Sequence, residues 1–111
     1  MKKVYFDSAA TTQLRSEVIR CMSEVLKTEY GNPSSTHSYG RSSKSLLETA
    51  RKEIAGYLNV SASEIIFTSG GTEADNLALQ SAVTDLGVER IISSKIEHHA
   101  VLHTIEVLED R

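Results

Sequence analysis

Apolar residues recur every three or four positions in three stretches of the chain, a spacing that places them on one face of a helix. The pattern predicts amphipathic helices over about residues 14–28 and 42–58, and a last helix that begins near His99. Between them, a third helix over about 72–86 is expected, because two glycines precede it and Gly87 follows it. The chain should therefore contain four helices, joined by more polar segments.

Residues that favour turns support these limits. Residues 30–40 hold two glycines and the single proline of the chain, which predicts a loop. Asn59 follows the second predicted helix and Gly87 follows the third, at positions where asparagine and glycine commonly end helices.

Short runs of apolar and β-branched residues predict strands. Residues 65–67 and 90–93 are such runs, on either side of the third predicted helix, and residues 4–6 form a further short extended run. Strand, helix and strand in direct succession form a βαβ unit, whose strands are parallel with a right-handed crossover. The sequence thus predicts an α/β fold, with helices packed on a short parallel sheet.

Two glycines separate the first of these strands from the helix that follows. Gly70 and Gly71 permit a sharp turn and leave the backbone N–H groups unobstructed. Thr72 then opens the helix, and Asp75 three residues later matches a capping box. Free N–H groups and the positive end of the helix dipole suit a phosphate or another anion. The alternative is a turn that only connects two elements, because neither a dinucleotide fingerprint nor a P-loop is present.

Histidines are expected at the same edge of the sheet as this turn. In parallel sheets, ligands bind beyond the carboxyl ends of the strands, and residues 94–99 follow the second predicted strand. On residue pattern alone, His98 is more typical of a helix cap or a surface side chain than of a catalytic group. Cys21 lies within the first predicted helix and is interpreted as a packing residue.

Size and charge narrow the possible functions. The 111 residues allow at most one small domain, with 40% hydrophobic and 24% charged residues. A net charge of −3 argues against a nucleic-acid-binding surface, and no apolar run is long enough to span a membrane. A single cysteine excludes an internal disulfide and fits a reducing cytoplasm.

Four motifs together indicate a family. They occupy residues 5–12, 31–40, 66–76 and 94–101. In this order and spacing they closely resemble the amino-terminal part of the cysteine desulfurases of the NifS and IscS kind. Those are class V, fold-type I transferases that use pyridoxal 5'-phosphate (PLP). The resemblance implies that residues 1–40 form an amino-terminal strand, helix and loop, and that residues 41–111 begin the large cofactor-binding domain.

The same resemblance assigns roles to three residues. Gly71 and Thr72 would hold the cofactor phosphate through backbone N–H groups and the threonine hydroxyl. His98 would stack on the cofactor ring and transfer protons, which makes it both a cofactor-binding and a catalytic residue. His98 is assigned rather than His99 because it directly follows Glu97, as in the family motif, and His99 is expected to point elsewhere. No metal site is expected.

The family's activity is also implied for the whole enzyme. It would convert L-cysteine to L-alanine and an enzyme-bound persulfide, whose sulfur passes to a scaffold protein for iron–sulfur clusters or to tRNA thiolation. The resemblance implies a cytoplasmic homodimer, with no nucleic acid or membrane bound by this segment.

Some family residues have no counterpart here. The lysine that binds the cofactor and the nucleophilic cysteine lie further along in the family, and Lys95 and Cys21 stand in other contexts. Gln13 replaces a usual proline, which affects the helix start rather than the chemistry. The chain is therefore expected to be an amino-terminal fragment that is inactive alone. The alternatives are another class V enzyme, such as a selenocysteine lyase, and a non-catalytic module that binds partners.

Overall fold

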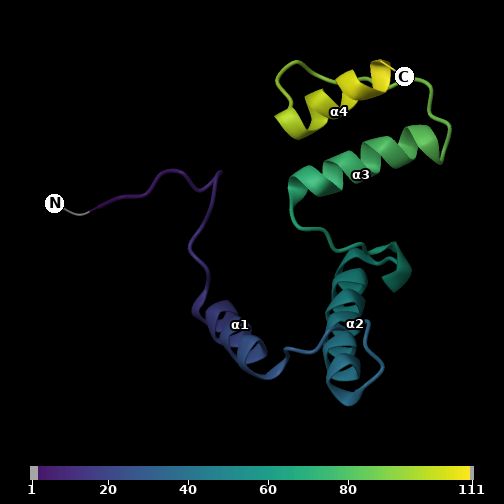
Figure 1. The fold of residues 1–111 in the computed structure, drawn as a ribbon. Coiled ribbons are helices and arrows are strands. Elements are labelled where there is room, and N and C mark those ends of the chain that lie inside the picture. The colour runs from purple at the N-terminus through teal and green to yellow at the C-terminus, as the bar shows by residue number, and fades with distance from the viewer. Residues whose placement is uncertain (1–2, 111) are drawn as a thin grey trace. The chain divides into compact units, whose positions relative to one another are not determined.

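The computed structural model describes residues 3–110 (Figure 1). The elements, in order, are α1 (Ser16–Thr28), α2 (Ser38–Leu58), the short 3₁₀ helix η1 (Ala62–Glu64), α3 (Gly71–Thr84) and α4 (His99–Glu109). The chain forms two compact units, of which one ends at Ile65 and the other begins at Ile66. The first unit holds α1, α2 and η1, and the second holds α3 and α4. The domain limit predicted after residue 40 stays a prediction.

Helix α1 confirms the first predicted helix, with its start two residues later. Glu17 lies in its first turn and Lys27 in its last, so both charges favour the helix dipole. None of its residues is buried, although Val18 and Met22 are apolar and belong to the predicted amphipathic pattern. The apolar face of α1 therefore has no cover within the described residues of its unit.

Helix α2 begins four residues earlier than predicted. His37 precedes it, and its Nδ1 atom accepts the Gly40 N–H at 3.3 Å. This side-chain cap supplies an acceptor for one of the helix's free donors, so the predicted loop ends at residue 37. The other end agrees with the prediction, because Asn59 adopts a left-handed conformation at φ 55° and its N–H bonds back to the last helical turn.

The segment after α2 folds back against that helix. Ser61 and Glu64 form a reciprocal capping box around η1, which packs on α2. The Arg51 guanidinium on α2 donates to the Ile65 carbonyl and lies 3.2 Å from a Glu48 carboxylate oxygen. These polar contacts fix the end of the first unit.

Helices α3 and α4 pack against each other and make up the second unit (Figure 1). Helix α3 ends at Thr84, two residues before the predicted limit. Gly87 then takes a left-handed conformation at φ 68°, while the Val88 N–H bonds to the Ala82 carbonyl at 3.0 Å. The turn-forming role predicted for Gly87 is confirmed, since a positive φ favours glycine.

The predicted parallel sheet is not confirmed. No strand pairing is present anywhere in residues 3–110, so residues 65–67, 90–93 and 4–6 form neither a helix nor a paired strand. Residues 3–110 therefore contain no βαβ unit. A strand needs a neighbour for its N–H and C=O groups, and an apolar run marks burial without showing which segment supplies that neighbour.

Few apolar side chains are buried. Within the described residues, Ala55 and Ala100 are the buried hydrophobic residues, whereas Phe6, Ile92 and Ile96 are each 92% exposed. Burial of large apolar side chains is the main source of folding free energy. Neither unit thus contains a substantial hydrophobic core of its own.

Two glycines of α2 should respond oppositely to substitution by alanine. A Cβ at Gly40 would lie 2.4 Å from the Ser35 carbonyl oxygen, so Gly40→Ala should lower the free energy of unfolding by about 1–3 kcal/mol. A Cβ at Gly56 meets no atom within 4 Å, so Gly56→Ala should raise it by about 0.5–1 kcal/mol. Urea unfolding of both variants measures this. Equal destabilisation by the two substitutions would contradict the packing described for Gly40.

Candidate functional site

The first turn of α3 presents backbone donors without an internal partner. Gly70 precedes the helix in an extended conformation and carries no side-chain cap, and the Ala74 N–H makes the first bond, to the Gly70 carbonyl. The N–H groups of Gly71 and Thr72 have no acceptor among residues 3–110. A Cβ at Gly70 or Gly71 would meet no atom within 4 Å, so the approach to these donors is open. This is the arrangement that binds anions at a helix start.

The predicted capping box at this turn is wrong. Thr72 is the second residue of α3 rather than its cap, so Asp75 lies too far into the helix to close a box. Glu73 takes that part instead: one carboxylate oxygen accepts from the Ser69 N–H at 2.6 Å and from the Ser69 hydroxyl at 2.7 Å. The capping box was assigned wrongly because α3 begins at Gly71, one residue before its predicted start at Thr72.

The bonds from Ser69 change the acidity of Glu73. The Ser69 hydroxyl, and after it the Ser69 backbone N–H, hold the pKa of the Glu73 carboxyl below its ordinary value of 4.5. The ionised carboxylate is thus favoured near the positive end of α3 and is directed onto the turn.

A cavity of about 360 Å³ lies at the start of both helices of the second unit. Its lining residues are Thr72, Asn76 and Gln80 from α3, His98 before α4, and His99, Ala100, His103, Thr104 and Val107 from α4. The structure thus brings together two of the three predicted site residues, Thr72 and His98. Gly71, the third, does not line this cavity, although it adjoins Thr72.

His98 caps α4. Its Nδ1 atom accepts the Ala100 N–H at 3.1 Å, so the capping role expected from residue pattern alone is present. A neutral imidazole that accepts at Nδ1 carries its proton at Nε2, and that atom stays available for other contacts. The cap orients the ring within the cavity wall.

The expectation that His99 points away from the site is wrong. His99 lines the same cavity as His98, and its ring stacks on His103 with 5.4 Å between ring centroids. His103 in turn lies 3.0 Å from a Glu106 carboxylate oxygen. His99 is the first residue of α4 and shares a face with His103, one turn later, so its ring lies along the helix face that lines the cavity.

A partly buried polar contact that the sequence did not reveal joins the two helices beside this cavity. The Asn76 amide nitrogen donates to the Thr72 carbonyl at 2.8 Å and lies 3.4 Å from the Ala100 carbonyl, while the Asn76 side-chain oxygen accepts from the Thr104 hydroxyl at 2.7 Å. An asparagine inside an amphipathic helix was the available signal, since asparagine is unfavourable there without a specific partner.

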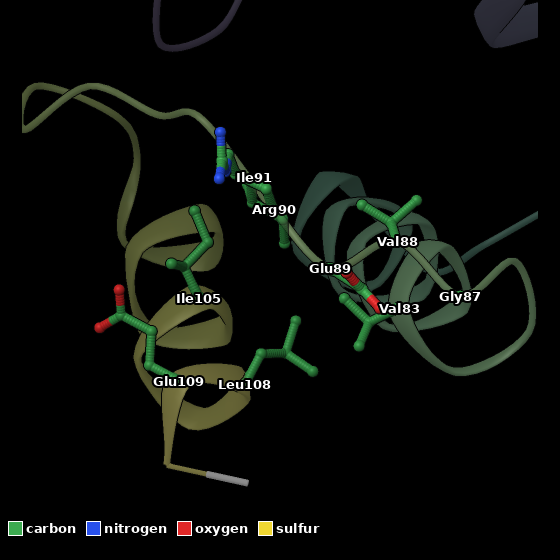
Figure 2. Close-up of a pocket in the computed structure, with 9 residues that line it drawn as sticks. All are labelled: Val83, Gly87, Val88, Glu89, Arg90, Ile91, Ile105, Leu108 and Glu109. Carbon is green, nitrogen blue, oxygen red and sulfur yellow. The ribbon is translucent and has the colours of Figure 1, made fainter.

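A second cavity lies at the opposite ends of the same two helices (Figure 2). It has a volume of about 640 Å³, and the Leu108 side chain on α4 reaches toward Val83 on α3. Val88, Ile91 and Ile105 add to its apolar lining. No predicted site residue lies here, and its chemistry is that of an uncovered packing surface.

Neither a metal centre nor a membrane-crossing helix occurs in the described part of the chain. Residues 3–110 contain no group of three or more histidine, cysteine, aspartate or glutamate side chains arranged to hold a metal ion. Among the helices of that range, none combines the length and the apolar character needed to cross a membrane.

Comparison with known proteins identifies the family. The pattern described as "Aminotransferase class-V" matches residues 4–111, nearly the entire chain. The chain belongs to the class-V aminotransferase family. The predicted resemblance to this family is thereby confirmed.

Individual proteins similar to this chain support the same family. The chain is 47% identical over 110 residues to "Cysteine desulfurase IscS" of Dictyoglomus turgidum and 48% identical over 111 residues to "Cysteine desulfurase IscS" of Methanosarcina thermophila. Each match covers 97% of this chain, and the chain spans 28% and 27% of the two relatives' lengths.

A solved class-V structure has the same fold over this length. The chain matches a "NIFS-like protein" with a TM-score of 0.87 and 39% identity, covering 98% of this chain and 30% of that one. The chain thus has the fold of the corresponding part of that protein.

Substitution of Ser69 should change the titration of Glu73. Ser69→Ala removes the hydroxyl that most strongly lowers the Glu73 pKa, so that pKa should rise toward 4.5, as measured by carboxyl ¹³C NMR. Because the folded-state pKa is lowered, the stabilisation from Glu73 is present above about pH 4.5 and is lost as pH falls through the folded pKa. Ser81→Ala, which lies in α3 two turns after Glu73, serves as the control. An unchanged Glu73 pKa in Ser69→Ala would refute the contact.

Proposed function

We propose that this chain is the amino-terminal part of a PLP-dependent cysteine desulfurase. The whole protein would convert L-cysteine to L-alanine and leave the sulfur as a persulfide on an enzyme cysteine. The observation that carries the proposal is that Thr72 and His98 line one cavity. These residues belong to two different motifs and are 26 positions apart in the sequence. The cysteine desulfurase names of the relatives support the same reaction.

The residues present fit the cofactor's phosphate. The N–H groups of Gly71 and Thr72, the Thr72 hydroxyl and the dipole of α3 offer several donors to one anion. The Glu73 carboxylate would repel a phosphate, but its two hydrogen bonds hold it at Ser69 and leave the N–H groups of Gly71 and Thr72 free. Open space at Gly71 permits close approach of the phosphate to the backbone.

His98 supplies the part of the site that would face the pyridine ring of the cofactor. Its Nδ1 bond to the Ala100 N–H fixes the imidazole plane, which offers a flat face for stacking, and Nε2 remains to hold or move a proton. When bound, PLP supplies the electron sink that desulfuration of an amino acid requires. The lysine and the reactive cysteine of such an enzyme would come from other parts of the whole protein.

Exposed surfaces of this chain support further assembly. Apolar side chains such as Met22, Leu26 and Ile92 are half-exposed or more, and residues 65–67 and 90–93 form no strand pair within residues 3–110. We place those two segments as strands of a larger sheet in the whole protein. The family resemblance extends the proposal to a cytoplasmic homodimer that passes sulfur to an acceptor scaffold.

A comparison of the whole protein with the 111-residue chain tests the function. The whole protein should bind PLP, become yellow and release sulfide and alanine from L-cysteine in the presence of a thiol. The chain alone should be colourless or lose PLP on dialysis, because a few charge-assisted hydrogen bonds of about 1–3 kcal/mol each do not offset the cost of ordering the cofactor. A whole protein that neither binds PLP nor releases sulfide would disprove the proposal. Preference for selenocysteine over cysteine would favour the selenocysteine lyase alternative.

The two adjacent histidines provide a second test. His98→Ala should lower turnover of the whole protein by about 10²–10⁴-fold, the usual contribution of an acid–base group, whereas His99→Ala should change it by less than about tenfold. Steady-state kinetics with L-cysteine measure both variants. Since His99 lines the same cavity, equal losses in the two variants would reject His98 as the specific proton-transfer group.

A further inference from the structure

The side chain of Asn76 contacts the first turns of both helices in the second unit. Its amide nitrogen is 2.8 Å from the carbonyl oxygen of Thr72, in the first turn of α3, and 3.4 Å from that of Ala100, in the first turn of α4. Its oxygen faces the Thr104 hydroxyl at 2.7 Å. One carboxamide thus connects the residue that would bind the phosphate with the turn that His98 caps.

The partners fix which end of the carboxamide is which. An amide nitrogen donates two hydrogens and an amide oxygen only accepts, so the nitrogen belongs toward the two carbonyls. The Thr104 hydroxyl oxygen is 2.7 Å from both Asn76 Oδ1 and the Ala100 carbonyl, and it has a single proton. Ala100 has another donor in Asn76, whereas Asn76 Oδ1 has none besides Thr104 among residues 3–110. The Thr104 hydroxyl therefore donates its proton to Asn76 Oδ1, and this hydrogen bond joins α4 to α3.

This contact lies in the best-buried part of the second unit. Thr104 is 5% exposed and Ala100 is 7% exposed, and no residue of α3 itself is buried. Hydrogen bonds are stronger in low dielectric, and a half-satisfied buried pair is costly, so such a contact favours one alignment of the helices over others. The apolar contacts of α3 and α4 are less directional.

We infer that Asn76 is a positioning residue, held by Thr104, that aligns the start of α4 with the start of α3 so that His98 and Thr72 face one bound cofactor. The inference rests on the proposed function. Asn76 does not itself act on the substrate. It determines where His98 lies relative to the phosphate-binding turn, and a displacement of that ring slows the chemical step more than it weakens substrate binding.

Four variants of the whole, cofactor-loaded protein separate positioning from general destabilisation. Asn76→Leu removes the bridge, Thr104→Val removes only the hydroxyl, and Thr104→Ser keeps it. Thr84→Val is the matched control, because the Thr84 hydroxyl also bonds to a carbonyl one turn earlier, at 2.9 Å from that of Gln80, but spans no second helix.

Kinetics give the first readout. Asn76→Leu and Thr104→Val should each lower kcat by about tenfold while the KM for L-cysteine stays within about twofold. Thr104→Ser and Thr84→Val should retain kcat within about twofold. If Asn76→Leu fails to fold, Thr104→Val carries the test, because it leaves Asn76 in place and conserves the side-chain volume.

Coupling to His98 gives the decisive readout. In a His98→Ala background the group to be positioned is absent, so Asn76→Leu or Thr104→Val should cost less than about twofold further in kcat. A merely structural role would cost the same tenfold in both backgrounds, and that additive result would overturn the inference. So would full activity of Thr104→Val.

A measurement without substrate completes the experiment. The dissociation constant of PLP, from its absorbance on dialysis, should rise by about threefold to tenfold in Asn76→Leu and stay unchanged in Thr84→Val. If the unsubstituted protein binds no PLP, the proposed function is wrong and the positioning role is withdrawn with it. If that protein binds PLP and releases sulfide but Asn76→Leu alters neither the dissociation constant nor kcat, the positioning role alone is wrong.

Discussion

The packing of α4 on α3 determines where every residue of the proposed site lies. Both helices begin with backbone donors that need partners, and the contact around Ala100 and Thr104 places those two beginnings beside one cavity. The start of α3 keeps its donors free for an anion, whereas the start of α4 uses His98 as its cap. One free end and one capped end thus place a turn suited to an anion next to a fixed imidazole.

The same unit has little else to hold it together. Its larger apolar residues surround an open cavity of about 640 Å³ or face solvent, as Ile92 and Ile96 do. Residues 65–67 and 90–93, which were predicted as strands, form no strand pair within the described part of the chain. Surfaces of this kind fit a chain that spans less than a third of its cysteine desulfurase relatives. We expect the rest of the whole protein to complete the sheet and bury these side chains.

Helices could be predicted from the sequence because their signals are local. The spacing of apolar residues located α1, α2 and α4, and the flanking glycines located α3. Asn59 and Gly87 adopt the left-handed conformations that their positions suggested. The start of α2 was predicted four residues late because a histidine, His37, serves as its cap, and histidine is not among the usual capping residues. The pairing of strands could not be predicted, since it depends on which distant segment lies alongside.

The site was predictable only in part. Motifs located Thr72 and His98, whose shared cavity the structure describes, but the motifs carry no information on the bond between Asn76 and Thr104. That bond joins residues 28 positions apart on two helices, and its geometry depends on how those helices pack. The sequence also predicted Asp75 as the acidic residue that caps the glycine turn, whereas the structure has Glu73. The difference arises because α3 starts one residue earlier than predicted.

The central claim is that the start of α3 binds the phosphate while His98 contacts the ring of the same molecule. Binding of PLP and of pyridoxal, which lacks the phosphate, to the whole protein tests this claim most directly. Thr72→Val should weaken PLP binding by about tenfold or more and change pyridoxal binding little, because a charge-assisted hydrogen bond contributes about 1.5–3 kcal/mol. His98→Ala should weaken both ligands to a similar extent. Equal weakening of PLP and pyridoxal by Thr72→Val would contradict the assignment of the phosphate to this turn.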